Sequence, residues 1–195
     1  MAVRPPEAVL DAIAERVAGA ADAGTGLRWQ QREQWHLTLK FLGPVALVAP
    51  VLEGLSSASA ACAPFTFRVG GPGAFPNAGR ARVVWLGPAE GAGPMRELAA
   101  SVGSALGPVG YPPEDRPYNP HLTVARLKTP TGVRGVLETL GPEPVGPAWT
   151  VEEIVLYESR PSASGANYAA LGRFPLASRT PPGAGVPPDP DGDAP

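Results

Sequence analysis

The chain has 195 residues, of which 44% are hydrophobic and 17% charged, and its formal net charge is −2. This composition is typical of a folded globular protein, and the slight negative charge argues against a broad electropositive face for duplex nucleic acid. Phosphate recognition should therefore depend on a few local arginines. The single cysteine, Cys62, excludes an intramolecular disulfide and favours a reducing cytoplasm. No stretch approaches the roughly 18 uninterrupted apolar residues of a membrane helix, so we expect no membrane association.

The first half of the chain alternates between helical and extended patterns. A helix is predicted after Pro5-Pro6-Glu7, because its apolar residues recur at the spacing of one helix face. The elements predicted here, in chain order, are a short start at Ala2-Val3, that helix, strands at Leu27–Trp29 and Trp35–Leu42, a helix at about Pro50–Cys62 and a strand at Phe65–Val69.

Gly70 to Asn77 contains three glycines and two prolines among eight residues, and this predicts a loop. The elements that follow are a strand at Arg82–Leu86, a helix at Pro94–Leu106, a turn-rich stretch at 107–120, a strand at His121–Leu127, a helix at Val133–Leu140 and strands at Val151–Ser159 and Asn167–Phe174. Residues 179–195 are rich in proline and glycine, acidic and without hydrophobic anchors, which predicts a disordered tail.

This order predicts an α+β protein in which residues 1–178 form a single two-lobed domain. Antiparallel-rich sheets should face a central groove, with helices outside. The length allows one sizeable core or two small lobes that pack closely.

Both histidines of the chain open the same kind of phrase, His36-Leu37-Thr38-Leu39 and His121-Leu122-Thr123-Val124. In a strand, residues i and i+2 point to the same face, so each phrase presents an imidazole and a hydroxyl together. Imidazole is the side chain best suited to transfer protons near neutral pH. The two phrases therefore predict an acid/base pair on a duplicated scaffold.

With these phrases and their neighbours, the chain resembles the two-histidine phosphoesterase superfamily, and within it the RNA 2′,3′-cyclic phosphodiesterases once named 2′-5′ RNA ligases. The similarity runs from about Ala2 to Leu176. Family members usually open with a longer apolar strand than Ala2-Val3, so either translation starts upstream or the lobe is built on a stub of that strand. The segments that carry the resemblance are His36–Gly43, Gly73–Pro76, Arg82–Gly87, Asn119–Arg126, Leu156–Arg160 and Tyr168.

The resemblance implies the two-lobed duplicated fold and metal-independent hydrolysis of RNA 2′,3′-cyclic phosphate ends, which leaves a 2′-phosphomonoester. It implies that His36 is the proton donor to the leaving O3′ and His121 the proton acceptor from water, whereas the residues alone leave the two roles interchangeable. Thr38 and Thr123 could hydrogen-bond the non-bridging oxygens. No cofactor or metal is expected. The implied partner is a single-stranded RNA terminus, weak reverse 2′-5′ ligation is implied as well, and we expect a monomer.

Three further residues are candidate substrate contacts. Arg126 could bind phosphate by resemblance, although regular alternation would place it on the face of Leu122 and Val124, so a bulge would have to redirect it. Trp35 and Tyr118 precede the two phrases and could stack on a terminal base, but aromatic residues beside strands are more often part of the core or its rim. Lys40 could share the His36 face or simply be solvated.

Two other functions remain open. The same groups could act on small cyclic nucleotides or 2′-5′-linked oligonucleotides. A non-catalytic module that binds RNA ends would keep the groove, although binding alone does not need two imidazoles.

Overall fold

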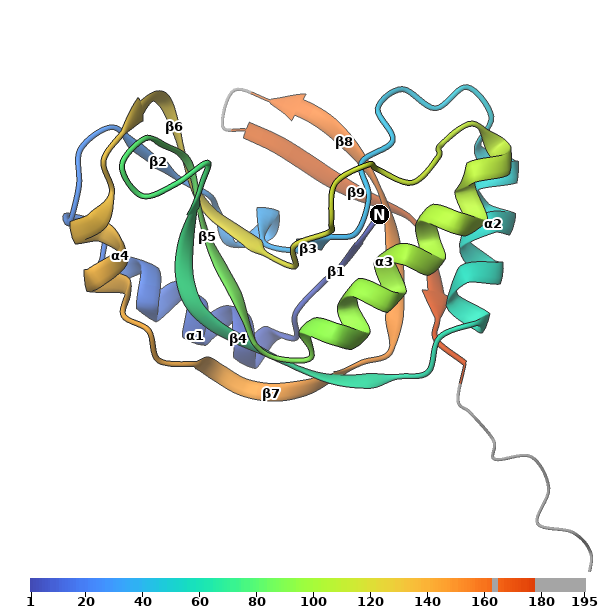
Figure 1. The fold of residues 1–195 in the computed structure, drawn as a ribbon, viewed down its shortest axis with the longest axis horizontal. Coiled ribbons are helices and arrows are strands. Elements are labelled where there is room, and N and C mark those ends of the chain that lie inside the picture. Colours follow the sequence, from blue (N-terminus) through green and yellow to red (C-terminus); the bar gives the residue numbers. More distant parts are fainter. Residues whose placement is uncertain (163–164, 178–195) are drawn as a thin grey trace, which may run out of the picture.

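A computed structural model describes residues 1–162 and 165–177 of the chain (Figure 1). The helices are α1 (Glu7–Gly19), α2 (Val48–Ala60), α3 (Ala92–Leu106) and α4 (Arg134–Leu140). The strands are β1 (Ala2–Val3), β2 (Leu27–Trp29), β3 (Leu37–Thr38), β4 (Phe65–Phe75), β5 (Ala81–Glu90), β6 (Leu122–Thr131), β7 (Val145–Val151), β8 (Glu153–Ser162) and β9 (Gly165–Pro175). Short 3₁₀ turns lie at Arg32–Gln34 and Gly107–Val109. The predicted α+β class is confirmed.

All described strand pairs are antiparallel, and together they form a single curved sheet in the order β7-β4-β5-β6-β3-β1-β8-β9, with β2 also paired to β6. Strands β4 to β7, with β2, make one lobe, against which α1 and α4 pack. Strands β3, β1, β8 and β9 make the other, which carries α2 and α3. The lobes meet where β6 pairs with β3. The expected sheets are thus one continuous sheet that spans both lobes.

The helices form where the apolar spacing predicts them, because each buries one stripe against the sheet or its neighbour. In α1 the buried side chains are Val9, Leu10, Ile13 and Val17, and in α3 they include Met95, Leu98, Val102 and Leu106. These residues belong to one hydrophobic cluster that continues through both lobes. The two phrases enter the same core through Leu37 and Leu122, which are 1% and 0% exposed.

The strand predicted at Trp35–Leu42 is much shorter than expected, because only Leu37 and Thr38 are in the ladder. A strand persists only where a neighbour offers backbone partners, and its neighbour β1 contributes two residues. After two further bonds, from Leu39 N and Lys40 N to Met1 O, the chain turns at Gly43, whose φ is +69°. The second strand likewise begins one residue later than expected, at Leu122.

The loop predicted at Gly70–Asn77 is wrong, since β4 continues through this segment to Phe75. Its glycines serve close packing within the sheet. A Cβ on Gly70 would lie 2.7 Å from the backbone N of Ala89, and one on Gly73 would lie 2.2 Å from the ring of Trp85. Register shifts near Arg68 and Val69 accommodate the extra residues.

Strand β7 was not expected, and it extends the sheet beyond β4. It runs from Val145 to Val151. Gly146 and Pro147 near its start are typical of turns, so the sequence pattern there did not indicate a strand. The tail predicted at 179–195 lies outside the described residues. Within the described part of the chain, no helix is long and apolar enough to cross a membrane.

Candidate active site

The two histidine phrases lie side by side as neighbouring antiparallel strands, with Leu37 directly opposite Leu122. Continuing this register by one residue in each direction places His36 opposite Thr123 and Thr38 opposite His121. Residues directly opposite each other point to the same face, and the two leucines point into the core. The two imidazoles and two hydroxyls therefore share the other face, and all four side chains are half-buried. They lie at the junction of the two lobes.

A bulge brings Arg126 to this face. Trp85 of β5 is paired with Thr123, and Val84 with Ala125, so Val124 is the extra residue on β6. Val124 and Ala125 are consequently both buried, whereas Arg126 is exposed. Val83, two residues before Trp85, is paired with Arg126. Arg126 thus points to the same side as Thr123, because the bulge interrupts the regular alternation between these two residues.

Two side chains anchor the segment that leads to His121 onto the first phrase. The Tyr118 hydroxyl donates a hydrogen bond to the backbone oxygen of Thr38 at 2.9 Å. The Lys40 ammonium donates to the backbone oxygen of Pro112 at 2.6 Å, and Lys40 is only 8% exposed. Lys40 is therefore not a solvated lysine. Both bonds fix the two phrases relative to each other.

Each imidazole contacts two aromatic rings. The rings of Phe75 and Trp85 lie 5.0 and 6.2 Å from the ring of His121, measured between centroids, with Phe75 edge to face. On the other side, Tyr168 and Tyr157 lie 4.8 and 6.0 Å from the ring of His36. Aromatic side chains thus pack beside both imidazoles and contribute to their burial.

A short local contact sets the tautomer of neutral His121. Its Nδ1 lies 2.8 Å from the backbone oxygen of Asn119. A carbonyl oxygen only accepts, so Nδ1 carries the hydrogen and the lone pair of the neutral ring is on Nε2. Burial lowers the pKa of His121, as do the charges of Arg126 and Arg116, while the Asn119 hydrogen bond opposes this.

The pKa of His36 is lowered further, to about 4. Burial is the main cause, followed by the positive charge of the chain's N-terminal amino group and then by those of Arg126 and Arg4, against a hydrogen bond with the backbone of Gln34. Both histidines are close enough to Arg126 for its charge to disfavour the imidazolium.

The two aromatic residues considered as stacking partners for RNA, Trp35 and Tyr118, pack against the core. Trp35 is 3% exposed and belongs to the hydrophobic core, so it offers no free ring face to a base. The stacking interpretation of Trp35 is therefore wrong. Tyr118 is half-buried against the core, and its hydroxyl is bonded to Thr38. Stacking on Tyr118 stays a prediction. In the structure, the Tyr118 hydroxyl anchors the first phrase through its hydrogen bond to Thr38.

The site includes neighbours that sequence reasoning did not single out as site residues. Phe75, Trp85, Tyr157 and Tyr168 surround the imidazoles, and Arg28 of β2 is directly opposite Arg126. The aromatic residues lie in segments with alternating patterns, but alternation does not tell which of two faces meets another strand. Arg28 lies in a three-residue strand whose partner is about a hundred positions away in the sequence, so nothing local identifies it.

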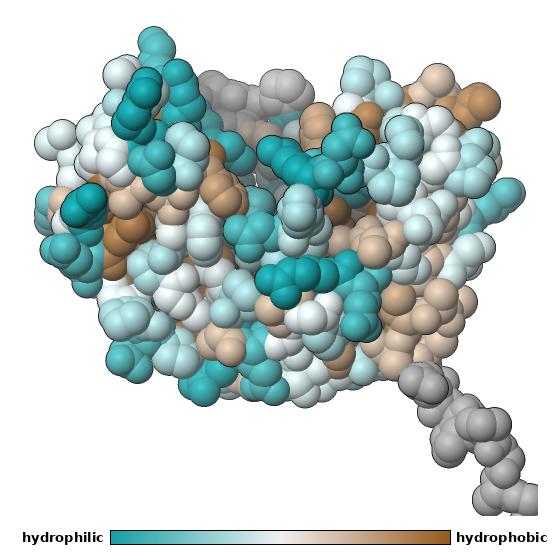
Figure 2. Space-filling model, viewed as in Figure 1, coloured by the Kyte–Doolittle hydropathy of each residue, from teal (hydrophilic) through white to brown (hydrophobic). Residues whose placement is uncertain are grey.

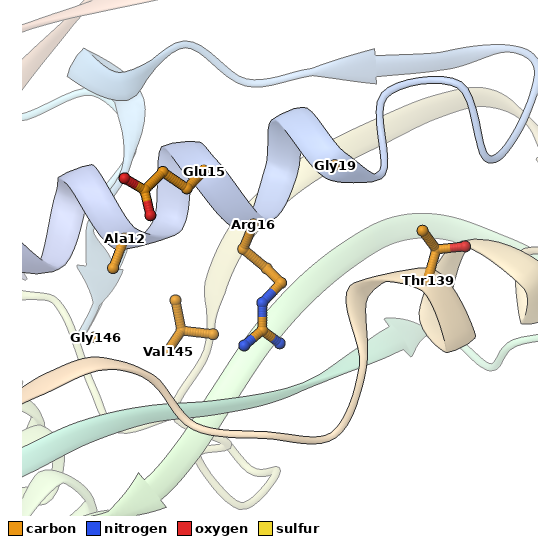
Figure 3. Close-up of a pocket in the computed structure, with 7 residues that line it drawn as sticks. All are labelled: Ala12, Glu15, Arg16, Gly19, Thr139, Val145 and Gly146. Atoms are coloured by element: carbon orange, nitrogen blue, oxygen red, sulfur yellow. The ribbon is translucent and has the colours of Figure 1, made fainter.

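Two cavities lie outside this face. One, of about 590 Å³, is lined by residues that include Lys40, Phe41, Leu156 and Tyr157, and so adjoins His36 through Tyr157. The other, of about 430 Å³, lies between α1, Thr139 of α4 and the start of β7, and Arg16 points toward it from α1 (Figure 3). Arg16 already donates to the backbone oxygen of Leu140 at the end of α4, at 2.5 Å, so this cation supports the fold. Among the described residues, no cluster of His, Cys, Asp or Glu is arranged to hold a metal.

Comparisons with known proteins match this architecture. The family model of the 2′-5′ RNA ligase superfamily matches residues 5–162. A curated relative, the RNA 2′,3′-cyclic phosphodiesterase of Aeropyrum pernix, is 36% identical over 108 residues, which are 55% of this chain and 61% of that protein. Alignments with the corresponding proteins of Geobacillus stearothermophilus and Aquifex aeolicus span 52% and 65% of their lengths. The chain thus spans about half to two thirds of these curated relatives.

Solved structures agree over more of the chain. TT0787 of Thermus thermophilus has a TM-score of 0.74 and 31% identity, with 91% of this chain and 97% of that one covered. E. coli LigT complexed with 3′-AMP has a TM-score of 0.70 and 26% identity, with 91% and 96% covered. The fold and the paired His-x-Thr phrases define a two-histidine phosphoesterase. The chain belongs to the 2′-5′ RNA ligase superfamily.

Proposed function

We propose that the protein hydrolyses 2′,3′-cyclic phosphate ends of RNA to 2′-phosphomonoesters. The observation that carries this proposal is the register Leu37↔Leu122, which gathers two imidazoles and two hydroxyls on one face. The names of the curated relatives support the substrate class. The exposed Arg126 beside both histidines supports an anionic substrate.

In the proposed reaction, water attacks phosphorus as His121 removes its proton. The bond from phosphorus to O3′ breaks, and His36 delivers a proton to O3′, so the phosphate stays on O2′. The Nδ1–H of His121 is bonded to Asn119, which leaves Nε2 free to accept, as a general base requires. The assignment of His36 as the acid follows the family resemblance. Each proton transfer contributes on the order of 10²–10⁴-fold to the rate.

The two threonines would hydrogen-bond the non-bridging oxygens, because each hydroxyl lies opposite the imidazole of the other phrase. Hydrogen bonds to an oxygen that gains charge stabilise the transition state more than the ground state. Arg126 would add a positive charge to the same side. Protein groups thus account for each task of the reaction, and the mechanism needs no metal.

The same arrangement can run backward, since the reverse reaction joins a 2′,3′-cyclic phosphate to a hydroxyl and forms a 2′-5′ bond. Weak 2′-5′ ligation is therefore part of the proposal. We also propose that the enzyme acts as a monomer in the cytoplasm, because all the residues of the site come from one chain and its single cysteine suits a reducing compartment.

The test uses an oligoribonucleotide that ends in a 2′,3′-cyclic phosphate. The product is separated by chromatography against the authentic 2′- and 3′-monophosphates. We expect the 2′-phosphate with wild-type protein, and His36→Ala is the control for contaminating phosphodiesterase. A 3′-phosphate would reverse the assigned leaving group. Failure to open the ring, with the protein folded, would reject the proposed function.

A further inference from the structure

Arg28 of β2 lies directly opposite Arg126 of β6 in the antiparallel ladder. Their neighbours Leu27, Trp29, Ala125 and Leu127 pack into or against the core, so both arginines point to the other face, and both are exposed. This is the face that carries Thr123, because the bulge at Val124 brings Arg126 into line with it. A second arginine therefore extends the site away from the histidines.

Like charges that face each other across a ladder are destabilising. Neither Arg28 nor Arg126 takes part in any salt bridge within residues 1–162 and 165–177. Lys128 of β6, two positions after Arg126, adds a third exposed cation to this pair, and the exposed Arg82 of β5 donates a hydrogen bond to the backbone oxygen of Lys128. This hydrophilic end of the β2, β5 and β6 lobe is visible at the upper left of Figure 2. An anion bound between the guanidinium groups of Arg28 and Arg126 would stabilise this pair of like charges.

The position of the pair fixes which anion it can reach. Strand residues advance by about 3.3 Å, so Arg126 lies about 7 Å from Thr123 along β6 once the bulged residue is discounted. Arg28 lies beside Arg126 on the edge of β6 that also pairs with β3, with Cα atoms of opposite residues about 5 Å apart. If Thr123 holds the cyclic phosphate, the next anion along an RNA strand is the phosphate on the 5′ side of the same nucleotide.

We infer that Arg28, together with Arg126, forms a subsite for the 5′ phosphate of the terminal nucleotide. This inference rests on the proposed function and adds a specificity to it. Guanidinium groups bind phosphate through two parallel hydrogen bonds, which fixes the orientation of the backbone as well as its charge. The enzyme should therefore prefer cyclic-phosphate ends that carry a 5′ phosphate to free nucleoside 2′,3′-cyclic phosphates.

The experiment compares two substrates that differ only in that group, adenosine 2′,3′-cyclic phosphate with and without a 5′ phosphate. The measured quantity is the ratio of kcat/KM for the phosphorylated compound to kcat/KM for the unphosphorylated one. We expect a wild-type ratio well above one and a ratio at least fivefold lower in Arg28→Gln. Arg28→Lys, which keeps the charge without the planar fork, should give an intermediate ratio. Arg96→Gln, an exposed charge change on α3, should leave the ratio within twofold of wild type.

The ratio cancels any general effect of the substitution on folding or on the amount of active enzyme. A wild-type ratio near one, or the same ratio in Arg28→Gln as in wild type, would overturn the subsite while ring opening itself continued. If the ratio fell to the same extent in Arg96→Gln, the preference for the 5′ phosphate would depend only on net charge, and the subsite would also be overturned. If wild-type enzyme opened neither compound nor a cyclic-phosphate oligonucleotide, the proposed function itself would fail.

Discussion

The surroundings of both imidazoles favour the neutral ring. Burial is the largest cause at each, and it lowers the pKa of His36 to about 4 and that of His121 by a smaller step from its ordinary value. A general acid has to carry a proton before it can give one. Free enzyme at neutral pH therefore holds little of the form in which one histidine is protonated and the other is not. A bound phosphate anion would favour the imidazolium and so restore it.

This gives a first prediction, on pH dependence. The pH profile of kcat/KM reports the free enzyme, and a group with a lowered pKa loses its proton at lower pH than usual. We expect kcat/KM to have its maximum below about pH 6.5, the ordinary value for histidine, and to fall steadily toward pH 8. The kcat profile should be displaced to higher pH, because the bound phosphate raises both pKa values. Initial rates between pH 4.5 and 8.5 at constant ionic strength give both curves, and a kcat/KM optimum above pH 7.5 would contradict the prediction.

Removing either imidazole is the second prediction. His36→Ala and His121→Ala should each lower kcat/KM at least a hundredfold, since each deletes one proton transfer. Circular dichroism and the thermal midpoint should show a folded protein, because both side chains are only half-buried. The double variant should be little slower than the slower single variant, as expected for groups that act as a unit. Wild-type rates in either single variant would remove that histidine from the mechanism.

At this scale the sequence predicted a good part of the candidate site. Alternation within each phrase was sufficient to place His36 and Thr38 on one face, and His121 and Thr123 on one face. It could not place Arg126, because the bulge at Val124 depends on how β5 pairs with β6. Of the two interpretations of Trp35, the core position is the one observed, since the same alternation that exposes His36 buries its neighbour.

At the scale of single elements, glycine in β4 provides space for an aromatic ring. Gly73 is paired with Trp85, and the indole ring lies over it, 2.2 Å from where a Cβ would be. The third prediction is that Gly73→Ala lowers the free energy of unfolding by about 1–3 kcal/mol, as overpacking does. It should also lower kcat/KM, because Trp85 contacts the ring of His121. Urea denaturation and initial rates measure the two effects.

Gly79→Ala is the matched control. The nearest atom to a Cβ at that position is Oδ1 of Asn77 at 3.4 Å, an ordinary contact distance. We expect wild-type activity in this variant and a change in stability below about 0.5 kcal/mol. Equal stability of the two alanine variants would show that the indole ring moves aside freely and would remove the packing role assigned to Gly73.

The elements also show why helices were easier to predict than strands. The apolar stripe of α1 or α3 is contained in its own segment, and the boundaries predicted for α3 differ from the observed ones by only two residues at its start. A strand ends where its neighbour ends, and the neighbours here are distant in sequence. That is why the run Trp35–Leu42 shortened to Leu37–Thr38, whereas Phe65–Val69 lengthened to Phe75.

For the whole molecule, the lobes do not coincide with halves of the sequence. Helix α1 packs against β7, which follows more than a hundred residues later, while β1 and β3 pair beside β8 and β9 in the other lobe. The sequence predicted two lobes and a shared site. It could not predict which elements belong to each lobe, because that depends on pairing between strands that are distant in sequence.

The fourth prediction concerns the complete enzyme. Since the proposed mechanism uses only protein groups, activity on a cyclic-phosphate oligonucleotide should be unchanged after dialysis against EDTA and in the presence of excess EDTA. Added Mg²⁺ or Zn²⁺ should not raise the rate. Product formation is measured at saturating substrate, with a known metal-dependent phosphodiesterase as the control for effective chelation. A large loss on chelation that metal restores would refute the metal-free mechanism.

Each histidine lies opposite the threonine of the other phrase, on either side of the pair Leu37 and Leu122. This arrangement has a consequence for the direction in which an RNA strand would bind. A half-turn about the midpoint of these two residues superimposes each imidazole and hydroxyl on its counterpart, so the four groups alone cannot distinguish the 5′ side of a nucleotide from the other. The tyrosines that border His36 and the arginines beyond Thr123 break this equivalence. In the proposed reaction, the rim of the site would therefore decide strand polarity and, with it, which ribose oxygen departs.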